Sequence, residues 1–382
     1  MTPEPQPWAH EFDQIPYRAY LNHAASTPSP KSVCKAIQEY AATFSHQGAR
    51  AWPKGLAIKQ SLRQKLAQLV HATDAEIGLT LNTSHGLMVV AQEFPWSPGD
   101  GIVLVKNEFP ANVVPWLQAA RNHGLRVHWL ELDDIRQETQ AFHRVMAAKP
   151  KLLAISWVQY QTGQAVSLAQ LSKVRADYGV AICLDAIQGL VPLTMDLKAT
   201  AIDFVAAGGH KWLMGPEGIG FLYINHQWAE RLNPGLVNWL SQTDPVDFLV
   251  QGPGLVNYDK PFRQTADHIE FGTSNNLGAA GLEAAVSLIL KIGPDIVASR
   301  IQSSAQYTWQ QLIAQGIQAI QPHAGIVSVP FPTKPQPIIT RLAEHGVIAG
   351  SPDGHIRFSP HIHNTEPQIQ WAVEQLAKSF QK

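Results

Sequence analysis

One lysine of the chain lies in a setting that favours covalent chemistry. Lys211 follows the apolar run Phe204–Ala207 and two glycines, within the stretch F-V-A-A-G-G-H-K-W. A lysine amine that is withdrawn from water has a lowered pKa and becomes a nucleophile able to form a Schiff base with a carbonyl group. The alternative is a solvated lysine that follows a strand, and this stretch alone leaves both interpretations open.

A carboxylate ends another apolar run. Asp185 follows Val180–Leu184, and an ionised carboxylate at such a position needs a cation or hydrogen-bond donors. A protonated heterocyclic nitrogen would be a suitable partner, and Asp185 would then keep that ring cationic. Gln188, three residues further on, could hydrogen-bond an oxygen of the same ring. The alternatives are an aspartate that caps the next turn and a glutamine exposed to solvent.

Three further sites carry side chains suited to a flat, anionic ligand. Phe109 could stack on a planar ring, although an aromatic residue at a strand end is often part of the core. Thr83 and Ser84 fall at an expected helix N-terminus, where free N–H groups and the helix dipole favour an anion. Arg357, at the end of a late strand, could bind a carboxylate through two hydrogen bonds or could be a solvated or structurally paired arginine.

Strands and helices alternate along most of the chain, which predicts an α/β fold with a doubly wound, mostly parallel sheet. The expected strands are 77–81, 101–105, 125–130, 151–158, 180–185, 204–207 and 218–224. The expected helices are 30–44, 60–70, 87–94, 111–123, 142–148 and 168–178. Ligands of such sheets bind beyond the carboxyl ends of the strands. We therefore expect one site to contain the residues that follow strands, which are Ser84, Phe109, Tyr160, Asp185 and Lys211.

The last part of the chain has a different pattern. Residues 228–263 are rich in proline and glycine, which predicts a long irregular excursion over the surface or against a partner. A helix is expected at 277–290, followed by helices 301–315, 338–345 and 366–380 and strands 325–329 and 354–359. The prediction is an N-terminal segment 1–27, a large domain 28–270 and a smaller C-terminal α+β domain 271–382.

Composition excludes several classes of function. The 382 residues carry a formal net charge of -1, which argues against an electrostatic grip on nucleic acid or on an anionic membrane. No apolar run is long enough to span a bilayer, and the first residues lack the pattern of a signal peptide. Two cysteines favour a reducing cytoplasm. The pair His361 and His363 has no zinc-like ligand spacing around it, so we expect small-molecule partners and no metal.

Five motifs together resemble the class V aminotransferase family of pyridoxal-phosphate (PLP) enzymes. They are N-T-S-H-G at 82–86, E-F-P-A-N at 108–112, D-A-I-Q-G at 185–189, G-H-K-W at 209–212 followed by G-P-E-G-I-G at 215–220, and E-F-G-T at 270–273. The family includes cysteine desulfurases, cysteine C–S lyases and isopenicillin N epimerase-like proteins. The resemblance implies the fold-type-I architecture, a homodimer with sites at the subunit interface, and Lys211 as the lysine that forms a Schiff base with the cofactor.

The resemblance also implies a role for each matching residue. Residues for the phosphate would be Thr83, Ser84, His85, His210 and, from the neighbouring subunit, Thr273. Residues for the ring would be Asp185 at the pyridine nitrogen, Gln188 at the hydroxyl, Phe109 in the stacking position and Tyr160 where an asparagine often reaches the ring oxygen. Residues for the substrate would be Arg357 at the carboxylate and the turn of Asn22, His23 and Ala24.

Two departures from the desulfurase pattern narrow the expected reaction. Phe109 replaces a ring-stacking histidine and carries no proton, so proton transfers would fall to Lys211. The loop 349–354, A-G-S-P-D-G, has no cysteine where the desulfurases have a nucleophile, so an enzyme-bound persulfide is not expected. The sequence therefore favours an aminotransferase or a cysteine/cystine C–S lyase, with an amino-acid epimerase or a non-catalytic PLP-binding protein as alternatives.

Overall fold

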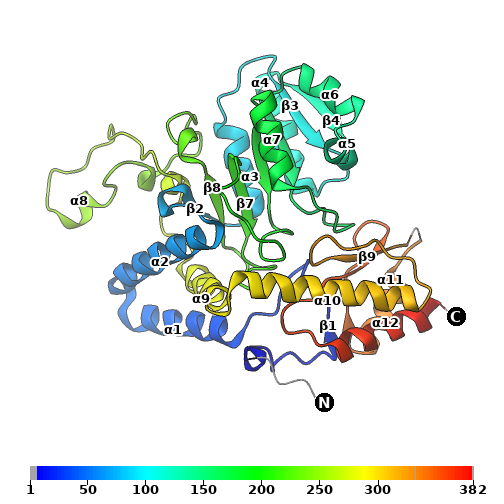
Figure 1. Cartoon of the computed structure of the whole chain (residues 1–382). Coiled ribbons are helices and arrows are strands. Elements are labelled where there is room, and N and C mark those ends of the chain that lie inside the picture. Colours follow the sequence, from blue (N-terminus) through cyan, green and yellow to red (C-terminus); the bar gives the residue numbers. More distant parts are fainter. Residues whose placement is uncertain (1–6, 332, 381–382) are drawn as a thin grey trace.

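The computed structural model describes residues 7–331 and 333–380, so residues 1–6 of the expected N-terminal segment lie outside the described residues. Figure 1 shows a central sheet with helices packed on it, and a long helix that leads from the sheet to the C-terminal part of the molecule. The strands of the central sheet are β2 (Ile77–Thr80), β3 (Gly101–Val105), β4 (Arg126–Leu130), β5 (Leu152–Ser156), β6 (Ala181–Asp185), β7 (Phe204–Gly208) and β8 (Gly220–Ile224).

These seven strands are ordered β2-β8-β7-β6-β5-β3-β4. The strands from β7 to β4 run parallel, whereas β8 is antiparallel to both of its neighbours, β7 and β2. Residues of β3, β5, β6, β7 and β8 are buried throughout, because the sheet is covered on both faces. The expected α/β fold with a mostly parallel sheet is confirmed, and the carboxyl ends of β5, β6 and β7 meet at one edge.

Helices cover both faces of this sheet. The helices of this part of the chain are α1 (Lys31–Gln47), α2 (Trp52–Val70), α3 (Thr83–Glu93), α4 (Val114–His123), α5 (Leu132–Arg136), α6 (Gln140–Ala147) and α7 (Leu168–Tyr178). Ile102 and Leu104 of β3 pack in one core with residues of α3 and α4. Val103 and Val105 face the other core, which includes residues of α2, α6 and α7. The alternation of side chains along each strand thus supplies two separate hydrophobic layers.

The C-terminal part builds two small sheets beside the central one. Its elements are α9 (Asn276–Ile292), α10 (Pro294–Ala314), β9 (Val327–Pro330), α11 (Gln336–Glu344), β10 (Val347–Ile348), β11 (His355–Phe358) and α12 (Glu366–Phe380). Strands β9 and β11 pair antiparallel, and β10 pairs parallel with β1 (Ala19–Tyr20) from the start of the chain. Helix α9 packs against α1 and α2 and shares their hydrophobic core. The division into 1–27, 28–270 and 271–382 stays a prediction.

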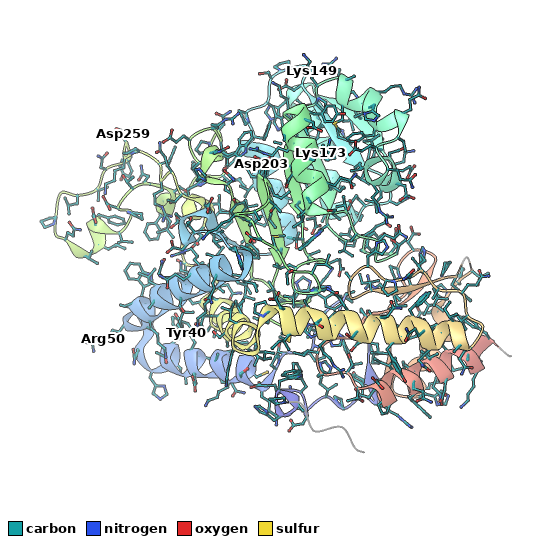
Figure 2. The ribbon with its side chains drawn as sticks, viewed as in Figure 1. Tyr40, Arg50, Lys149, Lys173, Asp203 and Asp259 are labelled. Atoms are coloured by element: carbon teal, nitrogen blue, oxygen red, sulfur yellow. The ribbon has the colours of Figure 1, made fainter. Side chains whose placement is uncertain are left out.

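The irregular segment forms an arm, which we define as residues 237–262. It contains a short 3-10 helix (Trp239–Ser241) and the short helix α8 (Asp247–Val250), and it reaches away from the central sheet (Figure 1). Figure 2 shows Asp259 on this arm and Asp203 within the body of the molecule. Apolar side chains are exposed along the arm: Val237, Trp239, Phe248, Leu249, Val250, Leu255, Val256, Tyr258 and Phe262.

Some elements differ from the expected ones. Helix α10 begins at Pro294, earlier than the expected start at residue 301, because proline is well suited to the first helical turn. The expected helix 111–123 is divided into a short 3-10 helix (Pro110–Asn112) and α4, and Val113 between them has non-helical backbone angles. Across the described ranges no helix combines the length and the apolar character that a membrane crossing needs.

Candidate active site

Lys211 lies in the turn that follows β7, at the carboxyl edge of the sheet. The turn is closed by hydrogen bonds from the Gly209 N–H to the Ile219 carbonyl, 2.8 Å, and from the Met214 N–H to the Lys211 carbonyl, 2.9 Å. Burial, together with the positive charge of Arg357, lowers the pKa of Lys211 to about 8, while Asp185 opposes the shift. The amine is therefore far easier to deprotonate than an ordinary lysine, as a nucleophile or base requires.

Asp185 ends the neighbouring strand β6 and is 3% exposed. Its Oδ1 accepts a hydrogen bond of 3.0 Å from the Ile187 N–H. Burial raises the pKa of Asp185 to about 6, and the nearby positive charge of Lys211 acts in the opposite direction. A buried carboxylate with one backbone donor has acceptor positions to spare, so a protonated ring nitrogen would satisfy it.

Two aromatic side chains lie beside Lys211. The ring centre of Phe109 is 5.9 Å from the Lys211 Nζ, and 49% of Phe109 is exposed. Tyr160, which follows β5, meets Phe109 edge to face with ring centroids 5.3 Å apart. An exposed aromatic face next to the lysine can stack on a flat ligand, so the structure brings together the expected Lys211, Phe109 and Tyr160.

The N-terminus of α3 adjoins the same turn. The Thr83 hydroxyl accepts a hydrogen bond of 2.9 Å from the Gly208 N–H, which fastens the helix end to β7. Asn82 caps the helix by accepting from the His85 N–H at 2.9 Å. The first amides of a helix have no partner inside it, so those of Thr83 and Ser84 are oriented to receive an anion.

Two histidines, His85 and His210, are expected at the phosphate. His85 stacks on Phe271, with centroids 5.1 Å apart, and its ring Nδ1 accepts from the Leu81 N–H. Its backbone N–H is occupied by the cap, whereas its ring Nε2 is buried without a hydrogen-bond partner among the described residues. His210 directly precedes Lys211, and burial lowers its pKa, so the ring is neutral near pH 7. Contacts of these residues with a phosphate stay predictions.

Gln188 holds two parts of the protein together. Its Nε2 donates to the Ala24 carbonyl at 2.8 Å, and its Oε1 accepts from the Trp212 indole at 2.9 Å. The residue thereby connects the N-terminal turn to the residue that follows Lys211. One N–H of the amide is left for a ligand oxygen, and its expected contact with a ring hydroxyl stays a prediction.

Arg357 forms the other end of the site. It lies on β11, is 5% exposed, and its Nη1 donates to the Tyr160 carbonyl at 2.7 Å. Burial lowers its pKa to about 10. The Arg357 Nε and the Asn22 Oδ1 are buried without a hydrogen-bond partner among the described residues. Unpaired buried polar atoms are costly, so this guanidinium is arranged to receive an anionic group.

Gly350 lies between these two unpaired atoms. A Cβ at this position would come within 2.7 Å of the Asn22 Oδ1 and 3.4 Å of the Arg357 guanidinium. The backbone of Gly350 also pairs with that of Arg357 through two hydrogen bonds of 2.9 and 2.8 Å. A side chain here would fill the space in front of the guanidinium, so glycine keeps that space open for a ligand.

The remaining residues of the N-terminal turn support the site from behind. His23 is fully buried, with its Nδ1 at 2.7 Å from the Ser359 carbonyl. Its ring packs against His361 and His363, at centroid distances of 5.2 and 4.9 Å. Burial lowers the pKa of all three histidines, which are therefore neutral packing groups. Among residues 7–331 and 333–380 there is no group of three or more His, Cys, Asp or Glu that could hold a metal ion.

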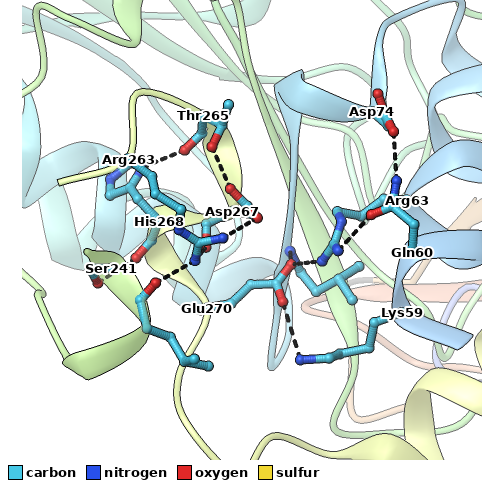
Figure 3. A network of polar contacts seen from close by, with 12 residues as sticks. Lys59, Gln60, Arg63, Asp74, Ser241, Arg263, Thr265, Asp267, His268 and Glu270 are labelled. Atoms are coloured by element: carbon cyan, nitrogen blue, oxygen red, sulfur yellow. Dashed lines mark hydrogen bonds and ion pairs between the residues drawn. The ribbon is translucent and has the colours of Figure 1, made fainter. Parts of the chain in front are cut away.

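Thr273 lies on a segment fixed by a buried ion cluster. Figure 3 shows Glu270 between Arg63 and Lys59 of α2, at 2.6 and 3.6 Å. The Lys59 Nζ also donates to the Ser274 hydroxyl at 3.1 Å. Thr273 itself is exposed and has a positive φ of 52°. The cluster holds an otherwise strained loop in one conformation and presents Thr273 outward.

The sequence analysis assigned no role to two features of the site. Glu108 accepts a hydrogen bond of 2.7 Å from the Ser156 N–H and also contacts the Ser156 hydroxyl, and burial raises its pKa to about 7. The sequence signal that could have identified Glu108 was its position after a strand and directly before Phe109. Gln161 and Asp353, joined at 2.9 Å, lie 192 residues apart, and no local pattern connects them.

Comparison with known protein families explains this arrangement. The aminotransferase class-V model matches residues 19–370. The chain belongs to this family. A probable cysteine desulfurase of Pyrococcus abyssi is 28% identical over 390 residues, covering 94% of each chain. The cysteine desulfurase CsdA of Escherichia coli is 31% identical over 276 residues, covering 70% of this chain and 66% of that protein.

Solved structures of this family agree with the fold. The cystine C–S lyase C-DES, in complex with its product cysteine persulfide, superposes with a TM-score of 0.84 at 25% identity, covering 95% of this chain and 97% of that one. A C-DES lysine-to-alanine mutant with glycine covalently linked to its PLP cofactor gives a TM-score of 0.87 at 25% identity, covering 97% and 99%. The expected family and the fold-type-I architecture are confirmed.

Proposed function

We propose that the protein is a PLP-dependent C–S lyase that acts on cysteine or cystine. The observation that carries this choice is the absence of a thiol beside Arg357. The two cysteines of the sequence are Cys34, exposed on α1, and Cys183, buried inside β6. A desulfurase transfers sulfur to its own cysteine, whereas a lyase releases sulfur with the product. The open space at Gly350 suits the second reaction.

The residues present fit PLP. A phosphate suits the N–H groups of Thr83 and Ser84, a pyridinium suits the buried Asp185, and an aldehyde suits the amine of Lys211. Phe109 would stack on the ring. When bound, PLP withdraws electrons from the substrate Cα and so stabilises the charge left after loss of the α-proton.

The chain supplies binding and proton transfer. Arg357 would hold the substrate carboxylate, because its Nε is buried and unpartnered. Lys211, whose pKa is lowered to about 8, would accept the α-proton, since Phe109 has no titratable group. The Cβ–S bond then breaks with its electron pair on sulfur, which takes up a proton. Water converts the released enamine to pyruvate and ammonia, so cystine gives cysteine persulfide and cysteine gives hydrogen sulfide.

We further propose a homodimer in which the arm and Thr273 face a second copy of the chain. Support comes from the apolar side chains that the arm exposes, with Tyr258 86%, Val250 63% and Val256 58% exposed. Thr273 is exposed and lines a surface pocket together with Trp239 of the arm. Its hydroxyl would complete the phosphate site of the neighbouring subunit.

Free thiols at Cys34 and Cys183 support a cytoplasmic location.

A substrate panel tests the reaction. The purified holoenzyme is offered cysteine, cystine and alanine with and without a keto-acid acceptor, and products are identified by mass spectrometry. Pyruvate with sulfide or persulfide is expected from the sulfur amino acids. If a keto acid forms only when the acceptor is present, the reaction is transamination and not C–S lysis. If the substrate is racemised, the reaction is epimerisation. Turnover by the Lys211→Ala variant would contradict the proposed chemistry altogether.

A further inference from the structure

A carboxylate is held at the edge of the site by a buried amide. Asp353 belongs to the loop 349–354, and its Oδ2 accepts from the Gln161 Nε2 at 2.9 Å. The same nitrogen lies 2.9 Å from the Tyr160 hydroxyl, and Gln161 is 5% exposed. Because the Tyr160 carbonyl accepts from Arg357 at 2.7 Å, a continuous chain of contacts joins Asp353 to the guanidinium.

Asp353 is oriented toward Gln161 at a conformational cost. Its φ is +30°, a region that favours glycine over other residues. The loop is kept in this form by the hydrogen bond between the His355 Nδ1 and the Asp353 carbonyl, 2.8 Å, and by the backbone pairing of Gly350 with Arg357. A fixed carboxylate is better suited to recognition than a mobile one, because less entropy is lost on binding.

The charge of Asp353 has no cation to match it. None of the ion pairs within the described part of the chain includes Asp353, and its side chain is exposed. Arg357, at the buried end, is equally without a carboxylate. The guanidinium of Arg357 at the buried end and the carboxylate of Asp353 at the exposed edge are thus both without an ionic partner, and Tyr160 lies in the chain of contacts between them. The α-carboxylate of any amino acid can satisfy the first, whereas only a substrate with a second cation can satisfy the other.

We propose that Asp353 forms a second substrate subsite, which binds the ammonium group on the leaving half of a sulfur-bridged diamino acid such as cystine. This inference rests on the proposed function. Cysteine has no second ammonium and leaves Asp353 unpaired, so the subsite selects bridged substrates over cysteine. The attraction lies at a solvated edge, where an ion pair changes affinity by roughly two- to fivefold and is weakened by salt.

Three mixed disulfides of cysteine differ in the charge on the leaving half, so they test the effect of that charge on turnover. Their other halves are cysteamine, with an ammonium, methanethiol, which is neutral, and mercaptoacetate, with a carboxylate. All three present the same Cβ–S bond and the same α-carboxylate for Arg357. We expect kcat/KM for pyruvate formation to fall from the first to the third, with about a two- to fivefold step between the ammonium and neutral compounds at low salt.

Variants of Asp353 test whether this residue causes the ranking of the three disulfides. Asp353→Asn keeps an acceptor for the Gln161 amide but removes the charge, so the three rates should converge while the neutral disulfide is unaffected. Asp353→Lys should reverse the order. Glu344→Gln, an exposed residue at the end of α11, removes the same charge elsewhere and should keep the wild-type order. Calorimetric binding of the three compounds to the Lys211→Ala variant should show the same ranking without turnover.

The outcomes separate the two proposals. Equal rates for all three disulfides in the wild type, or an order that survives Asp353→Asn, would overturn the subsite while leaving the lyase reaction intact. A loss of the order in Glu344→Gln would also overturn it, since general charge would then be responsible. Absence of pyruvate from every disulfide and from cysteine would overturn the proposed function itself, and the calorimetric ranking would still report on Asp353.

Discussion

The floor and the rim of the site are built in different ways. The floor consists of Asp185, which ends β6, and Lys211, which lies in the turn after the adjacent parallel strand β7. The rim consists of Arg357, the loop 349–354 and the turn at Asn22, which come from the two small sheets and the N-terminal strand. Pairing of adjacent strands in the central sheet fixes the floor, whereas short strand pairings and side-chain hydrogen bonds across long sequence separations together position the rim.

This difference suggests a division of labour. Groups on the floor meet every substrate at the same atoms, so they decide how the amine and the α-proton are handled. Groups on the rim meet the carboxylate and the leaving half, so they decide which molecule is accepted. Changes to the floor should therefore abolish turnover of all substrates, and changes to the rim should alter KM and preference.

Replacing the floor lysine should have the largest effect. We expect Lys211→Ala to lower kcat by roughly a thousandfold or more with every substrate, because both the nucleophile and the general base are lost. The purified variant should also lack the visible absorbance of lysine-bound cofactor, which spectrophotometry checks. An intact absorbance band would contradict the assignment of Lys211.

Replacing the rim arginine should separate binding from chemistry. Arg357→Lys keeps the charge but loses the planar guanidinium and its contact with the Tyr160 carbonyl. We expect KM to rise about ten- to a hundredfold, with a much smaller change in kcat, since a charged hydrogen bond is lost in ground and transition states alike. Steady-state kinetics with cystine measures both constants. A fall confined to kcat would instead mean that Arg357 acts in the chemical step, as the floor residues do.

Sequence reasoning succeeded where local signals are strong. The expected helix 168–178 matches α7, because Ser167 caps its start and Gly179, with a φ of 66°, ends it. Floor residues were found for a similar reason, since a polar residue directly after a buried apolar strand is conspicuous. Helix α9 was also expected, although its packing on α1 and α2 was not.

The rim was harder to predict because its contacts are long-range. Strands β1 and β10 have two residues each, too few to show an alternating pattern. The Gln161–Asp353 contact joins residues 192 positions apart, and the Gln188–Ala24 contact spans 164. The family resemblance pointed to Arg357 and Asn22, but only the structure reveals that Gly350 lies between them.

The smallest predicted effect concerns Glu108, which lies near Asp185 and tests how well the floor is shielded from water. Burial raises its pKa to about 7, above the ordinary 4.5, and the Asp185 charge adds to the shift. A group whose pKa is raised by folding contributes stability that is fully present below its unfolded pKa and is lost as pH rises through the folded value. The cofactor-free wild type should therefore lose stability relative to Glu108→Gln between about pH 5 and pH 8.

Thermal melting of the two cofactor-free proteins across that pH range measures this loss. The Glu108→Gln amide keeps an oxygen acceptor for the Ser156 N–H and cannot ionise, so the hydrogen bond is preserved while the titration is removed. Melting curves of Glu344→Gln should run parallel to the wild type, because that carboxylate is exposed. Parallel curves for Glu108→Gln would instead mean that Glu108 is ionised throughout, and that the floor near Asp185 is better solvated than its burial implies.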